Sequence, residues 1–214
     1  MNSLIEIDQA WLLWVNAQHS SWADVLMWYI SSRWLWIPLY IGIAALIWWR
    51  FGWRRALWII AIMGCAVGLA DWLTTLMKHT ICRPRPTHEP ALEGMIHIVN
   101  GYTGGQYGFP SSHASNTCVV ALLFSLIWTR PEPIAARKIS HASWAWLLWI
   151  WVALNCYSRM YLGVHYPGDI AVGLIVGAAV AAGAYALCRV SPPARLSGSS
   201  AAAACADAPQ NGGS

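Results

Sequence analysis

Residues 158–169 read SRMYLGVHYPGD, and they place an arginine, a histidine and an aspartate close together in a chain that carries few charges. Asp169 follows His165 by four residues, so its carboxylate can accept a hydrogen bond from one imidazole nitrogen and leave the other as a nucleophile. Arg159 adds a planar cation that suits phosphate oxygens. A histidine and an aspartate that merely cap the following helix are the alternative, but Arg159 makes this interpretation the weaker one.

Two other polar stretches complement this one. Residues 78–86 (KHTICRPRP) contain the cations Lys78, Arg83 and Arg85. Residues 110–113 (PSSH) end in His113, which can protonate a leaving group. With Arg159 these make four cations, which would repel one another if brought together unless an anion lay among them. The three stretches therefore predict an anion site.

Helix starts are expected beside the same stretches. Ser111 is placed to cap one helix, and Pro167 fits the first turn of another. Both starts would direct free backbone N–H groups and positive dipole ends at a bound anion. Phosphate is the anion that these features favour.

The composition places the chain in a membrane. Of its 214 residues, 57% are hydrophobic and 10% are charged, and 16 are tryptophans. So low a charged fraction excludes an ordinary water-soluble domain, and several uncharged runs approach the length of a bilayer crossing. We therefore expect an all-α polytopic membrane helix bundle, with the membrane and not nucleic acid as its partner.

Five apolar runs are long enough, or nearly so, to cross a bilayer: 34–49, 56–77, 114–129, 142–158 and 170–188. Residues 1–30 are apolar but interrupted by charged and amide side chains, which is typical of an amphipathic segment lying in the interface. A sixth crossing there stays open. The domain organisation is then this interfacial segment, a transmembrane domain over 31–190, and a disordered cytoplasmic tail over 191–214 that is rich in Ala, Gly, Ser and Pro.

Basic residues divide unequally between the two sides that alternating spans define. One side collects Arg50, Arg54, Arg55, Arg130, Arg137, Lys138, Arg189 and Arg195. The other side holds Arg33, Lys78, Arg83, Arg85 and Arg159. The positive-inside rule makes the first side cytoplasmic, so the three polar stretches are expected to converge on the outer, or periplasmic, face of a plasma membrane.

The three stretches resemble the signatures of the type 2 phosphatidic acid phosphatase (PAP2) superfamily, which are K-x6-RP, PSGH and SR-x5-H-x3-D. Lys78 and the Arg85-Pro86 pair match the first, residues 110–113 match three of the four positions of the second, and residues 158–169 match the third. The resemblance covers about residues 30–190. It implies a metal-independent lipid phosphatase that needs no cofactor.

The resemblance also implies a role for each matching residue. His165 is expected to attack phosphorus and form a phosphohistidine, Asp169 to orient and polarise His165, and His113 to donate a proton to the leaving oxygen. The implied phosphate-binding residues are Lys78, Arg85, Ser111, Ser112 and Arg159. Ser112 stands where the family has glycine; serine is acceptable at a helix start, so we expect activity to survive unless the position requires a positive φ.

The substrate is expected to be a lipid phosphate or diphosphate, because a cluster at the mouth of a helix bundle is reached laterally from the bilayer. The resemblance makes undecaprenyl diphosphate the first expectation, with phosphatidylglycerophosphate, phosphatidic acid and lipid A as alternatives. An anion or phospholipid transporter that uses the same cations is the alternative from another functional class.

Several other polar residues are given weaker roles. Asp71, inside the second run, is either a functional carboxylate or a hydrogen-bond partner of a neighbouring helix. Arg83 and His79 are interpreted as a substrate-side charge and an interfacial histidine. The spacing of the remaining loop residues and of the six cysteines indicates neither a metal site nor a disulfide framework; the loop residues are His88, Glu89, Glu93 and His97.

Overall fold

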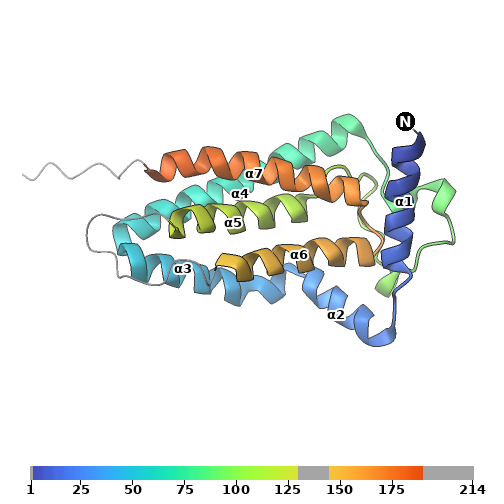
Figure 1. Ribbon diagram of the computed structural model, residues 1–214, viewed down its shortest axis with the longest axis horizontal. Coiled ribbons are helices and arrows are strands. Elements are labelled where there is room, and N and C mark those ends of the chain that lie inside the picture. The colour runs from blue at the N-terminus through green and yellow to red at the C-terminus, as the bar shows by residue number, and fades with distance from the viewer. Residues whose placement is uncertain (1, 130–144, 190–214) are drawn as a thin grey trace, which may run out of the picture.

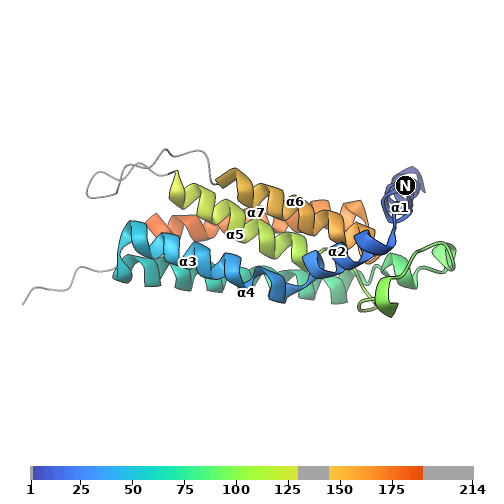
Figure 2. The same cartoon turned by 90° about the horizontal axis from the view of Figure 1, so that it is seen from below.

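Helices α3 to α7 run side by side along the long axis of the molecule, and α1 lies across one end of them (Figures 1 and 2). The structure is a computed structural model that describes residues 2–129 and 145–189. In order, the α-helices are α1 (Asn2–Asn16), α2 (Ser21–Ser31), α3 (Ile37–Phe51), α4 (Trp53–Ile81), α5 (Ser112–Trp128), α6 (Ala145–Tyr161) and α7 (Pro167–Arg189). Short 3-10 turns are η1 (Arg33–Trp36), η2 (Pro86–His88), η3 (Pro90–Leu92) and η4 (Val99–Gly101). The expected all-α class is confirmed for the described residues.

Among the described residues, three helical segments are long and apolar enough to cross a membrane: Arg33–Phe51, Trp53–Ile81 and Pro167–Arg189. Helix α5 is apolar but shorter. Over the described residues, each of the five predicted runs coincides with one of the helices α3 to α7, although α4 extends several residues beyond its run on both sides. The first residues of the fourth run, 142–144, lie outside the described residues. The number of spans, five or six, stays a prediction.

Helix α5 occupies the centre of the bundle, where it packs against α4, α6 and α7. Its contact with α7 is unusually close because two glycines face it. A Cβ atom at Gly173 would lie 2.5 Å from the carbonyl oxygen of Ser111, and one at Gly177 would lie 2.4 Å from that of Ser115. Small residues of this kind let helix backbones approach within a membrane. The approach also lets the Ser111 N–H donate to the Asp169 carbonyl (2.9 Å), which joins the second polar stretch to the third.

The alternating directions of the helices bring the three polar stretches to one end. The carboxyl ends of α4 and α6 and the amino ends of α5 and α7 all point toward the end that α1 covers (Figure 1). The segment 82–111, which carries the three turns η2, η3 and η4, lies at the same end (Figure 2). This convergence is the arrangement that the alternation of spans predicts.

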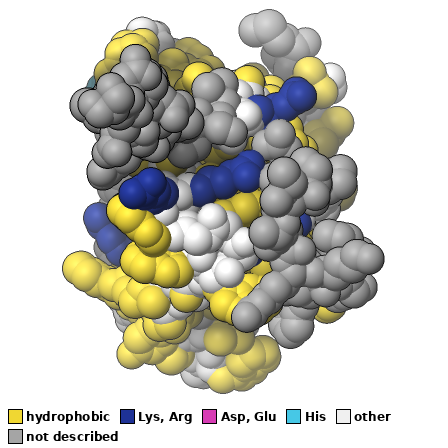
Figure 3. Space-filling view, turned by 90° about the vertical axis from the view of Figure 1, so that its left-hand side faces the viewer, with side chains coloured by type: hydrophobic (Ala, Val, Ile, Leu, Met, Phe, Trp, Pro, Cys, Tyr) yellow, Lys and Arg dark blue, Asp and Glu magenta, His cyan; other side chains and the backbone are white. Residues whose placement is uncertain are grey.

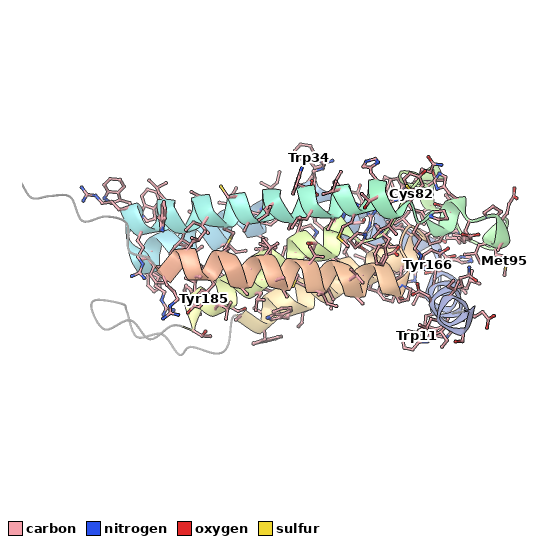
Figure 4. All side chains as sticks on the ribbon, turned by 90° about the horizontal axis from the view of Figure 1, so that it is seen from above. Trp11, Trp34, Cys82, Met95, Tyr166 and Tyr185 are labelled. Carbon is pink, nitrogen blue, oxygen red and sulfur yellow. The ribbon has the colours of Figure 1, made fainter. Side chains whose placement is uncertain are left out.

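The amino-terminal residues form two helices that are tied to this end of the bundle. The Asn16 side chain donates to the Tyr161 carbonyl (2.7 Å) and accepts from the His97 N–H (2.8 Å). Asp24 accepts from the Tyr161 hydroxyl (2.6 Å) and lies 2.9 Å from His97 Nε2. His97 is therefore a packing residue and not only a polar loop residue as its sequence context indicated. Trp11, labelled beside α1 in Figure 4, is exposed, while the placement of this segment in a bilayer interface stays a prediction.

The opposite end of the bundle is basic. Figure 3 shows lysine and arginine side chains there and no acidic side chain among the coloured residues of that face. Arg50 in the last turn of α3 and Arg189 in the last turn of α7 belong to this end. Four residues of the predicted cytoplasmic set, Arg130, Arg137, Lys138 and Arg195, lie outside the described residues, as does the predicted tail.

Candidate active site

A cavity of about 590 Å³ opens where the three polar stretches meet. Six of the eight predicted site residues line it: Lys78, Arg85, Ser112, His113, Arg159 and His165. The other two, Ser111 and Asp169, are fully buried directly behind it. Residues separated by more than 80 positions in the sequence thus surround one space.

His165 stands between α6 and α7 with its two ring nitrogens in different surroundings. Nδ1 lies 3.4 Å from Asp169 Oδ2, and Nε2 lies 3.3 Å from Arg85 Nη1. A carboxylate beside Nδ1 holds the proton on that nitrogen and leaves a lone pair on Nε2. The nitrogen that faces the cavity cations is therefore the one available to attack phosphorus.

The protonation state of His165 suits this role. Burial lowers its pKa well below the usual range, and the nearby cations Arg85, Arg159 and Lys78 lower it further. A nucleophilic imidazole must be neutral, so the surroundings favour the reactive form at neutral pH.

Asp169 is held by a network that the sequence did not reveal. Arg83 Nη1 donates to Asp169 Oδ1 (2.8 Å), while Arg83 Nη2 donates to Asp8 Oδ2 on α1 (2.6 Å). Asp8 Oδ1 also accepts from the Gly168 N–H at the start of α7 (2.7 Å). The Arg83 guanidinium lies 4.1 Å from the centre of the Tyr166 ring, and Tyr166 is drawn at this end of the bundle in Figure 4.

This network corrects the interpretation of Arg83 as a substrate-side charge. Its two carboxylate partners neutralise it, and it does not line the cavity. Three cations of the original four therefore face the site. In the sequence, Asp8 stood out only as an acidic residue within an apolar amino-terminal segment. No spacing pattern connected it with Arg83, which lies 75 positions later.

Lys78 and Ser112 form the second side of the cavity. Lys78 Nζ donates to Ser112 Oγ (2.5 Å), which also lies 2.8 Å from Thr74 Oγ1. Ser112 begins α5 and is not among the described residues with positive φ, so the backbone there does not require glycine. Its hydroxyl adds a polar contact that a glycine at this position lacks.

Ser111 takes the capping place that its sequence context predicts. Its hydroxyl accepts from the Ala114 N–H (3.4 Å) at the amino end of α5. It is fully buried and does not line the cavity. Its direct contact with phosphate stays a prediction, whereas the free N–H groups of the helix start point the positive end of a dipole toward the site.

Arg159 is fixed by partners from two segments that sequence reasoning left aside. It donates from Nη1 to the Ser31 hydroxyl on α2 and from Nη2 to the Tyr102 hydroxyl (3.1 Å) in the segment after η4. Only 3% of the residue is exposed. Such a buried cation without a carboxylate partner among these contacts is suited to bind an anionic substrate.

Asp71 also borders the cavity, deeper along α4. Its Oδ1 accepts from the Asn116 amide of α5 (3.1 Å), which agrees with the hydrogen-bonding alternative for this residue. Within the described parts of the chain no group of three or more His, Cys, Asp or Glu residues is arranged to hold a metal ion.

Comparisons with known proteins agree on one family. A family model described as the PAP2 superfamily matches residues 55–191. A lipid A 4'-phosphatase of Bacteroides thetaiotaomicron is 32% identical over 179 residues, which are 81% of this chain and 73% of that protein. A decaprenylphosphoryl-5-phosphoribose phosphatase of Mycobacterium tuberculosis is 36% identical over 129 residues, which are 60% of each chain. These matches confirm the resemblance that the three motifs indicated.

Solved structures show the same fold. A PAP2-type phosphatidylglycerolphosphate phosphatase from Bacillus subtilis superposes with a TM-score of 0.62 at 19% identity, over 87% of each chain. LpxE of Aquifex aeolicus superposes with a TM-score of 0.56 at 20% identity, over 82% of this chain and 92% of that one. The helical architecture is therefore that of known PAP2 membrane phosphatases.

Proposed function

This chain belongs to the PAP2 superfamily and is a membrane lipid phosphatase, and from that membership we propose that it works through a phosphohistidine on His165. The observation that carries the proposal is the meeting of three distant motifs around one cavity. His165 offers an unprotonated Nε2 beside Arg85 Nη1, and His113 lies in the same lining. The arrangement suits displacement at a phosphorus atom held between the two imidazoles.

The first step transfers the phosphoryl group to the enzyme. Nε2 of His165 forms a bond to phosphorus while the bond from phosphorus to the lipid oxygen breaks, and His113 gives a proton to that oxygen. The hydrogen bond from Nδ1 to Asp169 stabilises the positive charge that develops on the His165 ring. Water then attacks phosphorus and gives its proton to His113 while the bond from phosphorus to Nε2 breaks, so that inorganic phosphate leaves and His165 is restored.

The phosphate oxygens are bound by cations and by a helix start. Lys78, Arg85 and Arg159 surround the space in front of His165, and charged donors of this kind bind most strongly as charge shifts in the transition state. The backbone N–H of Ser112 and the amino end of α5 add neutral donors. Lys78 already contacts the Ser112 hydroxyl, which supports the assignment of this serine to the proposed phosphate site.

A lipid A phosphate is the first substrate to test. The sequence alone put undecaprenyl diphosphate first, but two relatives named lipid A 4'-phosphatase, from Bacteroides thetaiotaomicron and Porphyromonas gingivalis, match more than four fifths of this chain at 32% identity. Undecaprenyl diphosphate, phosphatidylglycerophosphate and phosphatidic acid follow. The basic end shown in Figure 3 supports an orientation with that end in the cytoplasm and the cavity at the outer face.

The test is phosphate release from a panel of these four lipids in detergent micelles. The His165→Ala variant should release none above background, whereas His79→Ala, which removes an exposed histidine from the end of the same bundle, should match the parent. Release from His165→Ala at a rate close to that of the parent would exclude His165 as the nucleophile.

A further inference from the structure

A second, smaller hollow of about 320 Å³ adjoins the cavity and is named here the leaving-group lobe. It shares Ser31, Arg33, Tyr102, His113 and Arg159 with the main cavity. Trp28 and Trp34 line the lobe alone, whereas Lys78, Arg85 and His165 line the main cavity alone. The lobe therefore opens on the side of the proton donor and away from the nucleophile.

The geometry of displacement at phosphorus determines what enters the lobe. The attacking and leaving atoms lie roughly in line on opposite sides of phosphorus. In the proposed mechanism His165 attacks from one side of phosphorus and His113 protonates the leaving oxygen on the other, so the group attached to that oxygen extends past His113. A separate apolar groove of about 300 Å³ meets the main cavity at Tyr40, Val67 and Asn116 but does not reach His113, so the lobe is the space next to the leaving oxygen.

The lining of the lobe combines aromatic rings with one available cation. Trp28 of α2 and Tyr102 meet edge to face with ring centres 5.6 Å apart, and Trp34 lies at the rim, 73% exposed. Figure 4 shows Trp34 projecting outward from the bundle. Arg33 is exposed and, in the part of the chain that the structure describes, makes no hydrogen bond or ion pair.

This lining matches the chemistry of a sugar better than that of a hydrocarbon chain. Aromatic side chains provide flat apolar surfaces with polar edges, and a sugar ring presents flat C–H faces bordered by hydroxyl groups. A small pocket with an aromatic wall and a few polar groups is a typical site for such a compact polar ring. Arg33 lies on the predicted outer side and belongs to none of the three motifs. Its guanidinium is placed to donate hydrogen bonds to the oxygens of a sugar ring.

Resting on the proposed function, we propose that the substrate is a glycolipid phosphate and that the leaving-group lobe binds its sugar ring. The ester bond between phosphorus and a sugar oxygen breaks, His113 protonates that oxygen, and the sugar leaves through the lobe. Trp28, Trp34 and Tyr102 contact the ring, and Arg33 binds its oxygens. One relative, the decaprenylphosphoryl-5-phosphoribose phosphatase, acts by its name on a phosphate carried by a sugar.

The experiment compares two phosphates that differ only in the leaving group. An acylated glucosamine 4-phosphate and a phosphatidic acid with the same acyl chains are assayed in the same micelles, and the readout is the ratio of their kcat/KM values. Arg33→Gln should lower this ratio by about 10- to 100-fold, the effect of losing a charged hydrogen-bond donor. Trp34→Leu, which keeps an apolar side chain for the bilayer interface, should lower it by ~3- to 10-fold, the effect of losing one aromatic contact. Arg54→Gln, an exposed arginine at the opposite end of the bundle, is the matched control and should leave it unchanged.

The outcomes separate this proposal from the proposed function. No phosphate release from any lipid by the parent protein contradicts the proposed function itself. Phosphate release with an unchanged ratio in Arg33→Gln and Trp34→Leu overturns the sugar site alone. A larger loss in Arg33→Gln for undecaprenyl diphosphate than for the sugar phosphate also overturns it, because Arg33 would then bind a second phosphate.

Discussion

Replacing Arg83 by glutamine should slow catalysis although Arg83 does not line the cavity. Its guanidinium holds Asp169 Oδ1 at 2.8 Å and thereby turns Oδ2 toward His165 Nδ1 and the Tyr166 N–H. Without that contact the buried carboxylate can rotate, and His165 loses the partner that fixes its reactive tautomer. Arg83 is thus a positioning residue that acts through Asp169.

The magnitude follows from the contact that is lost. A hydrogen bond between charged groups contributes roughly 1.5–3 kcal/mol, and about 1.4 kcal/mol in the barrier changes a rate tenfold. We expect kcat of Arg83→Gln to fall by about 10- to 100-fold, with a smaller change in KM because the phosphate ligands remain. Asp8→Asn should cost ~3- to 10-fold, since Arg83 keeps its direct contact with Asp169 and the asparagine oxygen can still accept from Gly168 N–H.

The assay is a double-mutant cycle on kcat for phosphate release. If Asp8 acts only through Arg83, the double variant should be no slower than Arg83→Gln alone, which is the non-additivity expected of one network. Glu93→Gln removes an exposed charge from the same 82–111 segment and should have no effect. A folded Arg83→Gln protein with kcat within twofold of the parent would refute the positioning role, and a raised kcat would show that Arg83 weakens Asp169 electrostatically.

Four further results are expected. Because the pKa of His165 lies well below its ordinary value of about 6.5, the imidazole stays neutral on mild acidification. Protonation of His165 should therefore produce no acid limb of kcat/KM above pH 6.5, and such a limb would contradict this. Ser112→Gly should keep activity within about tenfold, because it removes one hydroxyl contact with Lys78 from a helical position; complete loss would show that the hydroxyl is essential. Vanadate should inhibit and chelators should not, as the family implies, so a strict need for added divalent metal would favour another mechanism. Glu93→Cys, in a background without the exposed Cys82, should react with a membrane-impermeant reagent from outside the cell, and labelling only after lysis would reverse the proposed orientation.

The bundle and the catalytic motifs were predictable because each depends on a short-range signal. Uncharged runs mark the helices since a bilayer demands about 20 apolar residues per crossing. Fixed spacings mark the motifs, as with His165 and Asp169 one helical turn apart. Alternation of the helices then brings the motifs to one end without knowledge of any side-chain contact.

The supporting contacts were not predictable because they join residues that no local pattern connects. The ion pair between Asp8 and Arg83 depends on α1 folding across the end of the bundle. The hydrogen bonds from Arg159 to Ser31 and Tyr102 depend on how α2 and the 82–111 segment pack together. Arg83 was misinterpreted for the same reason: its sequence neighbours Lys78 and Arg85 line the cavity, whereas its own spatial partners are carboxylates.

The most direct test of the central claim is to trap the phosphorylated enzyme. The protein is mixed with a radiolabelled lipid phosphate, quenched in alkali within a turnover, and digested, and the labelled peptide is identified. The account predicts an acid-labile, alkali-stable phosphoryl group on His165, absent from His165→Ala and present in Glu93→Gln. Label on another residue, or turnover with no labelled protein at any quench time, would contradict it.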